Sequence, residues 1–155
     1  MPAEVMRRRA ADNPYLHRDF HGALSAAIQY LHERFGAEAV REYLRQFARS
    51  YYRCVREALA ARGLEVLQEH LQRIYAVEQA AIETELTPDQ LLVRVAVCPA
   101  VKHLRQRGYL VADLFVETTR TVNEALCEGT PFAAELVEYD PQTGRSVQRF
   151  YRRSA

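Results

Sequence analysis

Two histidines near the start of the chain, His17 and His21, are candidates for a catalytic or metal-binding role. Four residues apart on a helix, two imidazoles lie on one side and can face the same metal ion or substrate. The zinc-protease pattern HExxH is not present, because Arg18 stands where that pattern has Glu. The alternative is a partly exposed pair on the flank of a helix, and the sequence leaves both interpretations open.

Cys98 directly precedes Pro99, a residue that is favourable at the first position of a helix. A thiol at that cap lies near unpaired amides and the positive end of the helix dipole, which stabilise a thiolate. With His17 or His21 nearby in space, Cys98 would have the base that covalent acyl or amidine chemistry requires. The alternative is that Cys98 packs as a small hydrophobic residue, because buried cysteine usually does so.

The other two cysteines, Cys54 and Cys127, lie within predicted long helices, where packing is the favoured interpretation. Three cysteines are an odd number, and none forms a CxxC pair or lies close in sequence to a histidine. We therefore expect neither a disulfide framework nor a structural zinc site.

Polar residues that could bind a substrate lie on two later helices. Glu117 and Asn123 flank an apolar stripe, and if that face lines a cavity, Glu117 could hold a cationic group or act as a base. His70, with Tyr75 and Glu78, could face the same cavity from another helix. A solvated shoulder of each helix is the alternative. His103 lies between basic residues and is expected to be a solvated surface residue.

The first half of the chain, which carries the histidine pair, is predicted to be helical. Apolar residues at every third or fourth position predict helices over 14–35, 37–62 and 63–80. Asn13 can cap the first helix and Pro14 suits its first turn. The inward stripe of this helix is expected to comprise Leu16, Phe20, Leu24, Ile28, Leu31 and Phe35.

The second half is predicted to contain two hairpins and two more helices. Short segments rich in β-branched residues, joined by proline-containing turns, are typical of hairpins. The predicted strands are 82–86, 91–97, 132–139 and 145–151, and the predicted helices are 99–107 and 111–128. This order predicts an α+β fold, in which N-terminal helices pack on a four-stranded antiparallel sheet made of two hairpins joined by a helical crossover. Residues 1–12 are expected to be a flexible tail, and 13–153 a single domain.

Composition narrows the class of function. The chain has 155 residues and a net charge of +1, and its 21 basic residues are interleaved with 20 acidic ones, so we expect no nucleic-acid partner. No apolar run approaches the roughly 20 residues of a membrane span, so we expect no membrane partner. The first residues lack the apolar region of a secretory signal, which predicts a cytoplasmic protein. A phosphate loop, a GxSxG motif and a dinucleotide fingerprint are all missing from the sequence.

Three stretches, residues 12–21, 98–101 and 115–130, resemble the bacterial proteins grouped as L-2-amino-thiazoline-4-carboxylic acid hydrolase-like. The resemblance spans about Asp12 to Arg153 and implies hydrolytic opening of a thiazoline ring. Some relatives have further cysteines near Phe115-Val116 and in the last hairpin, whereas this chain has none after Cys127. The predicted order of elements is also similar to vinyl-reductase-type and vesicle-tethering folds, whose members bind hydrophobic or acyl ligands without catalysis.

These observations lead to two functional hypotheses. A third possibility is that the polar residues have a purely structural role. The first is hydrolysis of a cyclic C=N bond in a small amino-acid-like substrate, with Cys98 as nucleophile or with His17 and His21 activating water. That water would be activated directly or through a divalent metal, the one cofactor considered, and Glu117 would orient the substrate amine. The second is a non-catalytic module that binds a small or acyl ligand and forms a homodimer.

Overall fold

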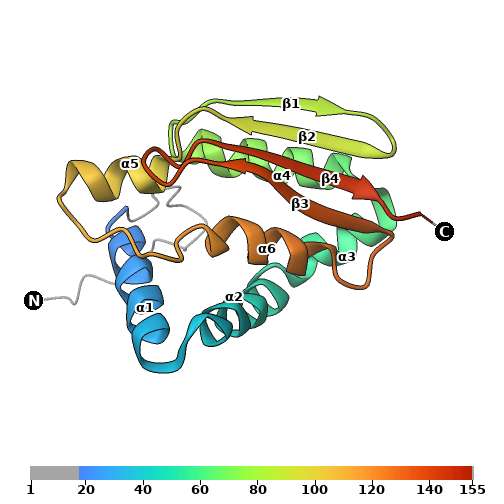
Figure 1. Cartoon of the computed structure of the whole chain (residues 1–155). Coiled ribbons are helices and arrows are strands. Elements are labelled where there is room, and N and C mark those ends of the chain that lie inside the picture. The colour runs from blue at the N-terminus through green and yellow to red at the C-terminus, as the bar shows by residue number, and fades with distance from the viewer. Residues whose placement is uncertain (1–17, 155) are drawn as a thin grey trace, which may run out of the picture.

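The computed structural model describes residues 18–154 (Figure 1). Along the chain these form α1 (Phe20–Phe35), α2 (Ala37–Tyr51), α3 (Arg53–Arg62), α4 (Glu65–Val77), β1 (Ile82–Leu86), β2 (Gln90–Val95), α5 (Pro99–Gln106), α6 (Glu117–Cys127), β3 (Phe132–Tyr139) and β4 (Ser146–Arg152). The predicted α+β class is therefore confirmed. The predicted cap at Asn13 and Pro14, and His17 itself, lie outside the described residues.

The four strands form one antiparallel sheet in the order β1-β2-β4-β3. Each hairpin stays intact, and the second hairpin joins the first through the β2–β4 pair, in which Leu91 lies opposite Phe150. The segment carrying α5 and α6 connects the two hairpins. This is the predicted helical crossover, and it brings the start of α5 to the end of the sheet where the last hairpin turns (Figure 1).

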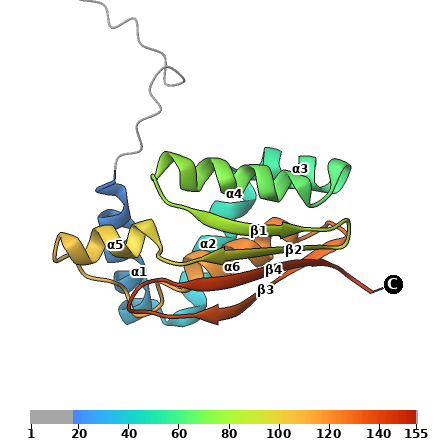
Figure 2. The ribbon, with the colours of Figure 1, turned by 90° about the horizontal axis from the view of Figure 1, so that it is seen from above.

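Alternation along the strands sends one side of the sheet into the core. Leu91, Val93 and Val95 of β2 are buried, and so is Phe150 of β4. Among the helices, α6 lies against the sheet, and α2 packs on α6 (Figure 1). Figure 2 shows α3 and α4 beside β1, which α4 contacts. The site therefore forms where helices from both halves of the chain meet the core side of the sheet.

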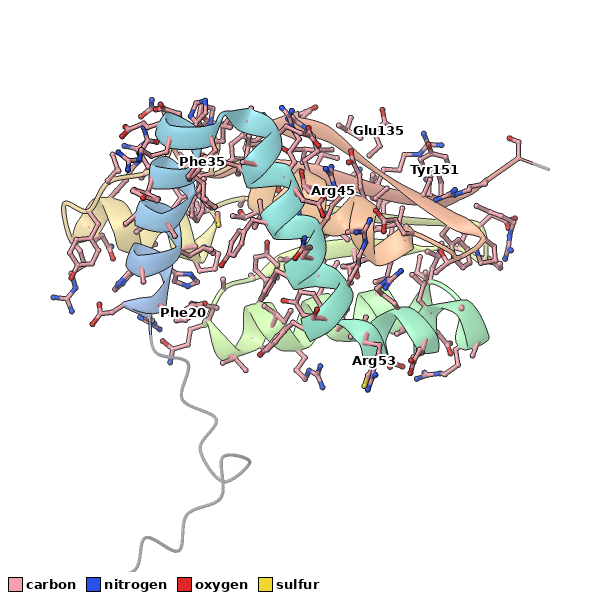
Figure 3. All side chains as sticks on the ribbon, turned by 90° about the horizontal axis from the view of Figure 1, so that it is seen from below. Phe20, Phe35, Arg45, Arg53, Glu135 and Tyr151 are labelled. Carbon is pink, nitrogen blue, oxygen red and sulfur yellow. The ribbon has the colours of Figure 1, made fainter. Side chains whose placement is uncertain are left out.

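The first helix differs from its predicted stripe at both ends. Ile28, in the middle of α1, is fully buried, but Phe20 and Phe35 are each 66% exposed (Figure 3). The prediction that these two rings face the core was wrong. Periodicity identifies the face of a helix, whereas the core on which the helix packs is shorter than the helix itself.

Two other helices have bounds that differ from the predicted ones. The predicted helix 37–62 is interrupted at Tyr52, whose ring packs edge-on against His70 with 5.0 Å between ring centroids. The predicted helix 111–128 begins only at Glu117. Ahead of it, Ser25 Oγ donates to Leu110 O and accepts from Ala112 N, so this stretch bonds to α1 instead of forming its own helical turns. None of the described helices has the length and apolarity needed to cross a bilayer.

Candidate functional site

A cavity of about 170 Å³ lies between α1, α4, α6, the start of α5 and strand β4. Its lining combines apolar side chains with polar ones. Its lining residues are His21, Tyr52, His70, Leu71, Ile74, Tyr75, Glu78, Cys98, Pro99, Ala100, Thr118, Thr119, Val122, Asn123, Leu126 and Gln148. We call this space the inner cavity. It contains four residues selected from the sequence, namely Cys98, His21, His70 and Asn123.

Cys98 is the N-cap residue of α5, as its position before Pro99 predicts. Its backbone is extended, and its carbonyl accepts the amide of Lys102 at 2.9 Å. The net effect of these surroundings on the pKa of the Cys98 thiol is opposite to the lowering that the sequence predicts. Burial raises the pKa of Cys98 above its usual value, the backbone amides of Val101 and Ala100 lower it, and the charge of Glu78 raises it. The surroundings of Cys98 therefore favour its protonated thiol over the thiolate.

The turn between β3 and β4 fixes Cys98 from the other side. The Cys98 amide donates to Thr143 O at 3.0 Å, and Gly144 packs directly on the cysteine. A Cβ at Gly144 would lie 2.3 Å from Cys98 Cβ, and its φ of +68° also favours glycine. Arg105 on α5 donates to Gln142 O at 2.7 Å. The hairpin turn thus holds the start of α5, and with it the thiol, in one position.

His21 is oriented by a buried carboxylate. Its Nε2 lies 2.7 Å from Oε1 of Glu78, although the two residues are 57 positions apart in sequence. Only 18% of the His21 side chain and 5% of the Glu78 side chain are exposed. When Nε2–H donates to the carboxylate, Nδ1 carries the lone pair. This is the arrangement in which a histidine acts as a general base with a carboxylate holding its tautomer.

His70 supplies a second imidazole, which burial favours in its neutral form. Burial, reinforced by the neighbouring charge of Arg73, lowers the pKa of His70 to about 4. Arg73 NH2 lies 3.4 Å from its Nδ1, and Tyr52 covers its edge. A histidine in this state offers one donor and one acceptor without adding charge to the cavity.

The wall opposite α4 is built from amides and hydroxyls. Asn123 Nδ2 donates to Gln148 Oε1 at 2.8 Å, and Gln148 Nε2 donates to Ser146 Oγ at 3.0 Å. Tyr75, on α4, lines the same cavity, and burial raises the pKa of its phenol while the side chain of Gln148 lowers it. Buried polar residues on the core side of a strand are unusual, because burying them without partners is costly. Their network fixes the polar wall of the inner cavity.

Glu117 does not line the inner cavity. Its side chain is 1% exposed and receives hydrogen bonds from Thr121 Oγ1 at 2.6 Å and from Arg120 at 2.9 Å. Arg41 Nε lies 3.6 Å away. The carboxylate is thus engaged where α2 meets α6, and the residue that orients a histidine in the cavity is Glu78.

His103 is a correction to the sequence analysis. Its side chain is only 12% exposed, and its Nε2 lies 3.4 Å from Asp19 Oδ1 without forming a hydrogen bond. The prediction of a solvated surface residue was wrong, because α1 packs against α5 and covers the ring. His103 lines a second hollow next to the inner cavity.

Sequence reasoning named Glu78 beside His70 as a residue that could face the cavity but gave it no role, and it missed Gln148 and Ser146 altogether. The alternation in β4 shows that Ser146, Gln148 and Phe150 share a face, but their mixed polarity hides which face is buried. Within residues 18–154, His, Cys, Asp and Glu side chains form no group of three or more arranged to hold a metal ion. Neither a protein-family model nor a curated protein sequence matches the chain.

Proposed function

We propose that this protein is a hydrolase in which Cys98 attacks the carbon of a C=N bond in a small, thiazoline-like substrate. The observation that supports this most is that Cys98 and the His21–Glu78 pair line one cavity. Cysteine, histidine and carboxylate in such a set supply nucleophile, base and orienting group. The resemblance of residues 98–101 to thiazoline hydrolases supports the same chemistry.

The size and charge of the inner cavity support a small substrate with an amidine-like group. A cavity of about 150 Å³ in another protein holds one benzene molecule. The 170 Å³ available here therefore fits a five-membered ring with one or two substituents. Among residues 18–154, Glu78 is the only acidic residue that lines the cavity, and no Lys or Arg of that part of the chain lines it. Such a lining favours a group that is neutral or positively charged.

The proposed reaction begins with a protonated thiol. His21 Nδ1 takes the Cys98 proton as Sγ bonds to the ring carbon, and the C=N π pair moves to nitrogen, which takes that proton. A nitrogen lone pair then re-forms a C=N bond as the ring C–S bond breaks, and the ring sulfur leaves as a thiolate. Water attacks the same carbon, the C=N π pair moves back to nitrogen, and His21 takes one proton from the water. The remaining O–H becomes C=O and gives its proton to the ring thiolate, while the bond to Sγ breaks and Sγ takes the proton from His21, which regenerates Cys98. The net change adds one water and leaves a carbamoyl group on the opened amino thiol.

Glu78 supports the step in which His21 carries a positive charge. An ion pair at 2.7 Å stabilises an imidazolium more than a neutral imidazole. The raised pKa of Cys98 makes this assistance necessary, because few thiolates exist at neutral pH without a base. Asn123 and His70 would bind the ring substituents as neutral hydrogen-bonding groups.

The test is turnover of 2-amino-2-thiazoline-4-carboxylate, followed by mass spectrometry of the opened product. We expect Cys98→Ser to lower kcat by about 10³-fold or more, since it removes the nucleophile. Cys54→Ser is the matched control, because Cys54 is an exposed cysteine on α3. Its turnover should equal that of the wild type. Full activity in a folded Cys98→Ser variant, or a wild type without turnover, would contradict the proposal.

The same assay separates the two hydrolytic routes. In the cysteine route, turnover persists after treatment with a chelator. If His17 and His21 activate water through a divalent metal, turnover is lost and returns when zinc or manganese is added.

A second candidate function is non-catalytic binding of a small ligand in the same cavity. It is favoured by the raised pKa of Cys98 and by the lack, within residues 18–154, of a hydrogen bond between this thiol and a histidine. Mass spectrometry of an organic extract of the purified protein would then detect a carried ligand. The Cys98→Ser variant would retain that ligand, and no thiazoline would be opened.

A further inference from the structure

The inner cavity has two hydrogen-bonding atoms that no residue within 18–154 uses, one on His70 and one on Asn123. These residues belong to α4 and α6, and both line the cavity. Only 7% of His70 and 8% of Asn123 are exposed. Because the cavity has a volume of about 170 Å³, a small ligand that fills it contacts both residues.

His70 presents an N–H donor to the cavity. Arg73 NH2 lies 3.4 Å from His70 Nδ1, and a guanidinium can only donate, so Nδ1 is the acceptor of this contact. In the neutral ring, which burial favours, the hydrogen therefore lies on Nε2. No described residue forms a hydrogen bond with Nε2, and this atom is not fully enclosed by protein. The donor is thus free for a ligand.

Asn123 presents the complementary group, an amide oxygen. Its Nδ2 donates to Gln148 Oε1 at 2.8 Å, and Gln148 donates in turn to Ser146 Oγ at 3.0 Å. This chain of hydrogen bonds fixes which end of the Asn123 amide faces strand β4. The other end, Oδ1, has no donor among the described residues and is not fully enclosed. A ligand N–H would pair with it.

The charges around the cavity favour a neutral ligand group at this pair. In the described part of the chain, Glu78 is the only acidic lining residue, and no Lys or Arg lines the cavity. Arg73 contacts the other nitrogen of His70 and is not a lining residue. A ligand carboxylate would therefore be buried without a lysine or arginine partner, and both Glu78 and Asn123 Oδ1 would repel it.

We infer that His70 and Asn123 form a subsite for a primary carboxamide, so that the preferred ligand of the inner cavity is a neutral amide and not a carboxylic acid. The carboxamide oxygen accepts from His70 Nε2, and the carboxamide nitrogen donates to Asn123 Oδ1. One carboxamide carries both the acceptor and the donor that this pair requires. The inference rests on the proposed function, because it names the substrate class of the same cavity.

The experiment compares thiazolidine-4-carboxamide with thiazolidine-4-carboxylate on the wild-type full chain. These saturated rings have no C=N bond, so the protein cannot open them by the proposed reaction, and they carry no amidine that could bind the same pair. Calorimetry gives the Kd of each probe. We expect the carboxamide to bind about tenfold more tightly or better, because the carboxylate leaves Asn123 Oδ1 unpaired and buries a charge.

Two single variants test the two contacts. His70→Phe keeps a ring but removes the N–H donor, and Asn123→Leu removes the acceptor at similar volume. Each should bring the two Kd values to within about threefold of each other. Thr119→Val is the matched control, because it removes a hydroxyl from another lining residue, and it should keep the full preference. Asn123→Leu also loses the bond to Gln148, so circular dichroism checks its fold, and His70→Phe carries the test if it does not fold.

The outcomes separate the inference from the proposed function. Equal binding of the probes, tighter binding of the carboxylate, no binding of either, or an unchanged preference in folded His70→Phe overturns the inference. If the wild type opens 2-amino-2-thiazoline-4-carboxylate but binds both probes equally, the inference alone fails. A carboxamide preference without turnover of any thiazoline supports the subsite and contradicts the hydrolysis. If both hold, the 4-carboxamide of that thiazoline should have the higher kcat/KM.

Discussion

Glu117 and Glu78 are two buried carboxylates with opposite surroundings. Glu117 accepts hydrogen bonds from Thr121 and Arg120 and lies near Arg41. Within residues 18–154, Glu78 has one hydrogen-bonded side-chain partner, His21, and it lines both the inner cavity and the neighbouring hollow that His103 lines. Burial alone therefore does not identify a functional carboxylate.

The difference lies in the partners of each charge. Arginine stays protonated at all ordinary pH values, so the environment of Glu117 is constant and no ligand is needed to complete it. The imidazole of His21 can be neutral or protonated, so the energy of the Glu78 pair changes when His21 takes a proton in a reaction. The first arrangement stabilises the contact of α2 with α6, and the second is suited to proton transfer.

Glu117→Ala should have the largest effect on stability. It removes two hydrogen bonds to a buried charge and leaves a small cavity, so we expect a loss of about 3 kcal/mol in the free energy of unfolding. Urea unfolding measures this loss. The turnover of the molecules that remain folded should not change. A loss of turnover without a loss of stability would show that Glu117 acts in the reaction, as the sequence first indicated.

Glu78→Gln should have the opposite profile. The amide oxygen can still accept from His21, so the unfolding free energy should change by less than about 1 kcal/mol. The neutral amide no longer stabilises the imidazolium, so kcat should fall by about 10²-fold. Steady-state kinetics at saturating thiazoline measures the effect. An unchanged kcat would show that Glu78 takes no part in the mechanism. Glu78 would then be a structural carboxylate, as Glu117 is.

The elements of the fold were predictable because their signals are local. Apolar spacing, β-branched runs and prolines in turns are each encoded within a few neighbouring residues, and β1 and β3 match their predicted bounds. Cys98 as the N-cap of α5 was predictable for the same reason. The exposed Phe20 and Phe35 were not, since the extent of the core depends on how helices pack.

The site required information that no local pattern contains. His21 and Glu78 meet only through the packing of α1 near the end of α4. The thiol of Cys98 shows the same limit, because the helix start lowers its pKa but burial by distant segments raises it more. Local reasoning placed Cys98 correctly at the N-cap of α5 and gave the wrong direction for its pKa shift.

His70 makes the stability of the protein depend on pH, because burial in the inner cavity favours its neutral imidazole. Its pKa falls from 6.5 to about 4 on folding, so between these values the unfolded chain binds a proton that the folded chain does not. The contribution of His70 to the free energy of unfolding is therefore complete above pH 6.5 and is lost as the pH falls. We expect the free energy of unfolding to decrease by about 2 kcal/mol between about pH 7.5 and about pH 5. Unfolding of wild type and His70→Gln across this range isolates the effect. If the free energies of unfolding of the two proteins change in parallel with pH, the imidazole of His70 is solvated and not buried.

Alkylation by iodoacetamide should show the smallest effect and tests the charge of Glu78 directly. Cys54 is exposed, whereas the pKa of Cys98 is raised by burial and by Glu78, so Cys98 should react more slowly at neutral pH. Because the Glu78 charge is one cause of that shift, Glu78→Gln should speed the labelling of Cys98 by about threefold. Glu117→Gln, which removes a charge from the other region, should leave that rate unchanged. Peptide mass spectrometry gives each rate separately. Faster labelling of Cys98 than of Cys54 in the wild type would instead mean that the start of α5 affects the pKa of Cys98 more than burial does. The thiolate would then exist before substrate binds, and His21 would serve the later attack by water.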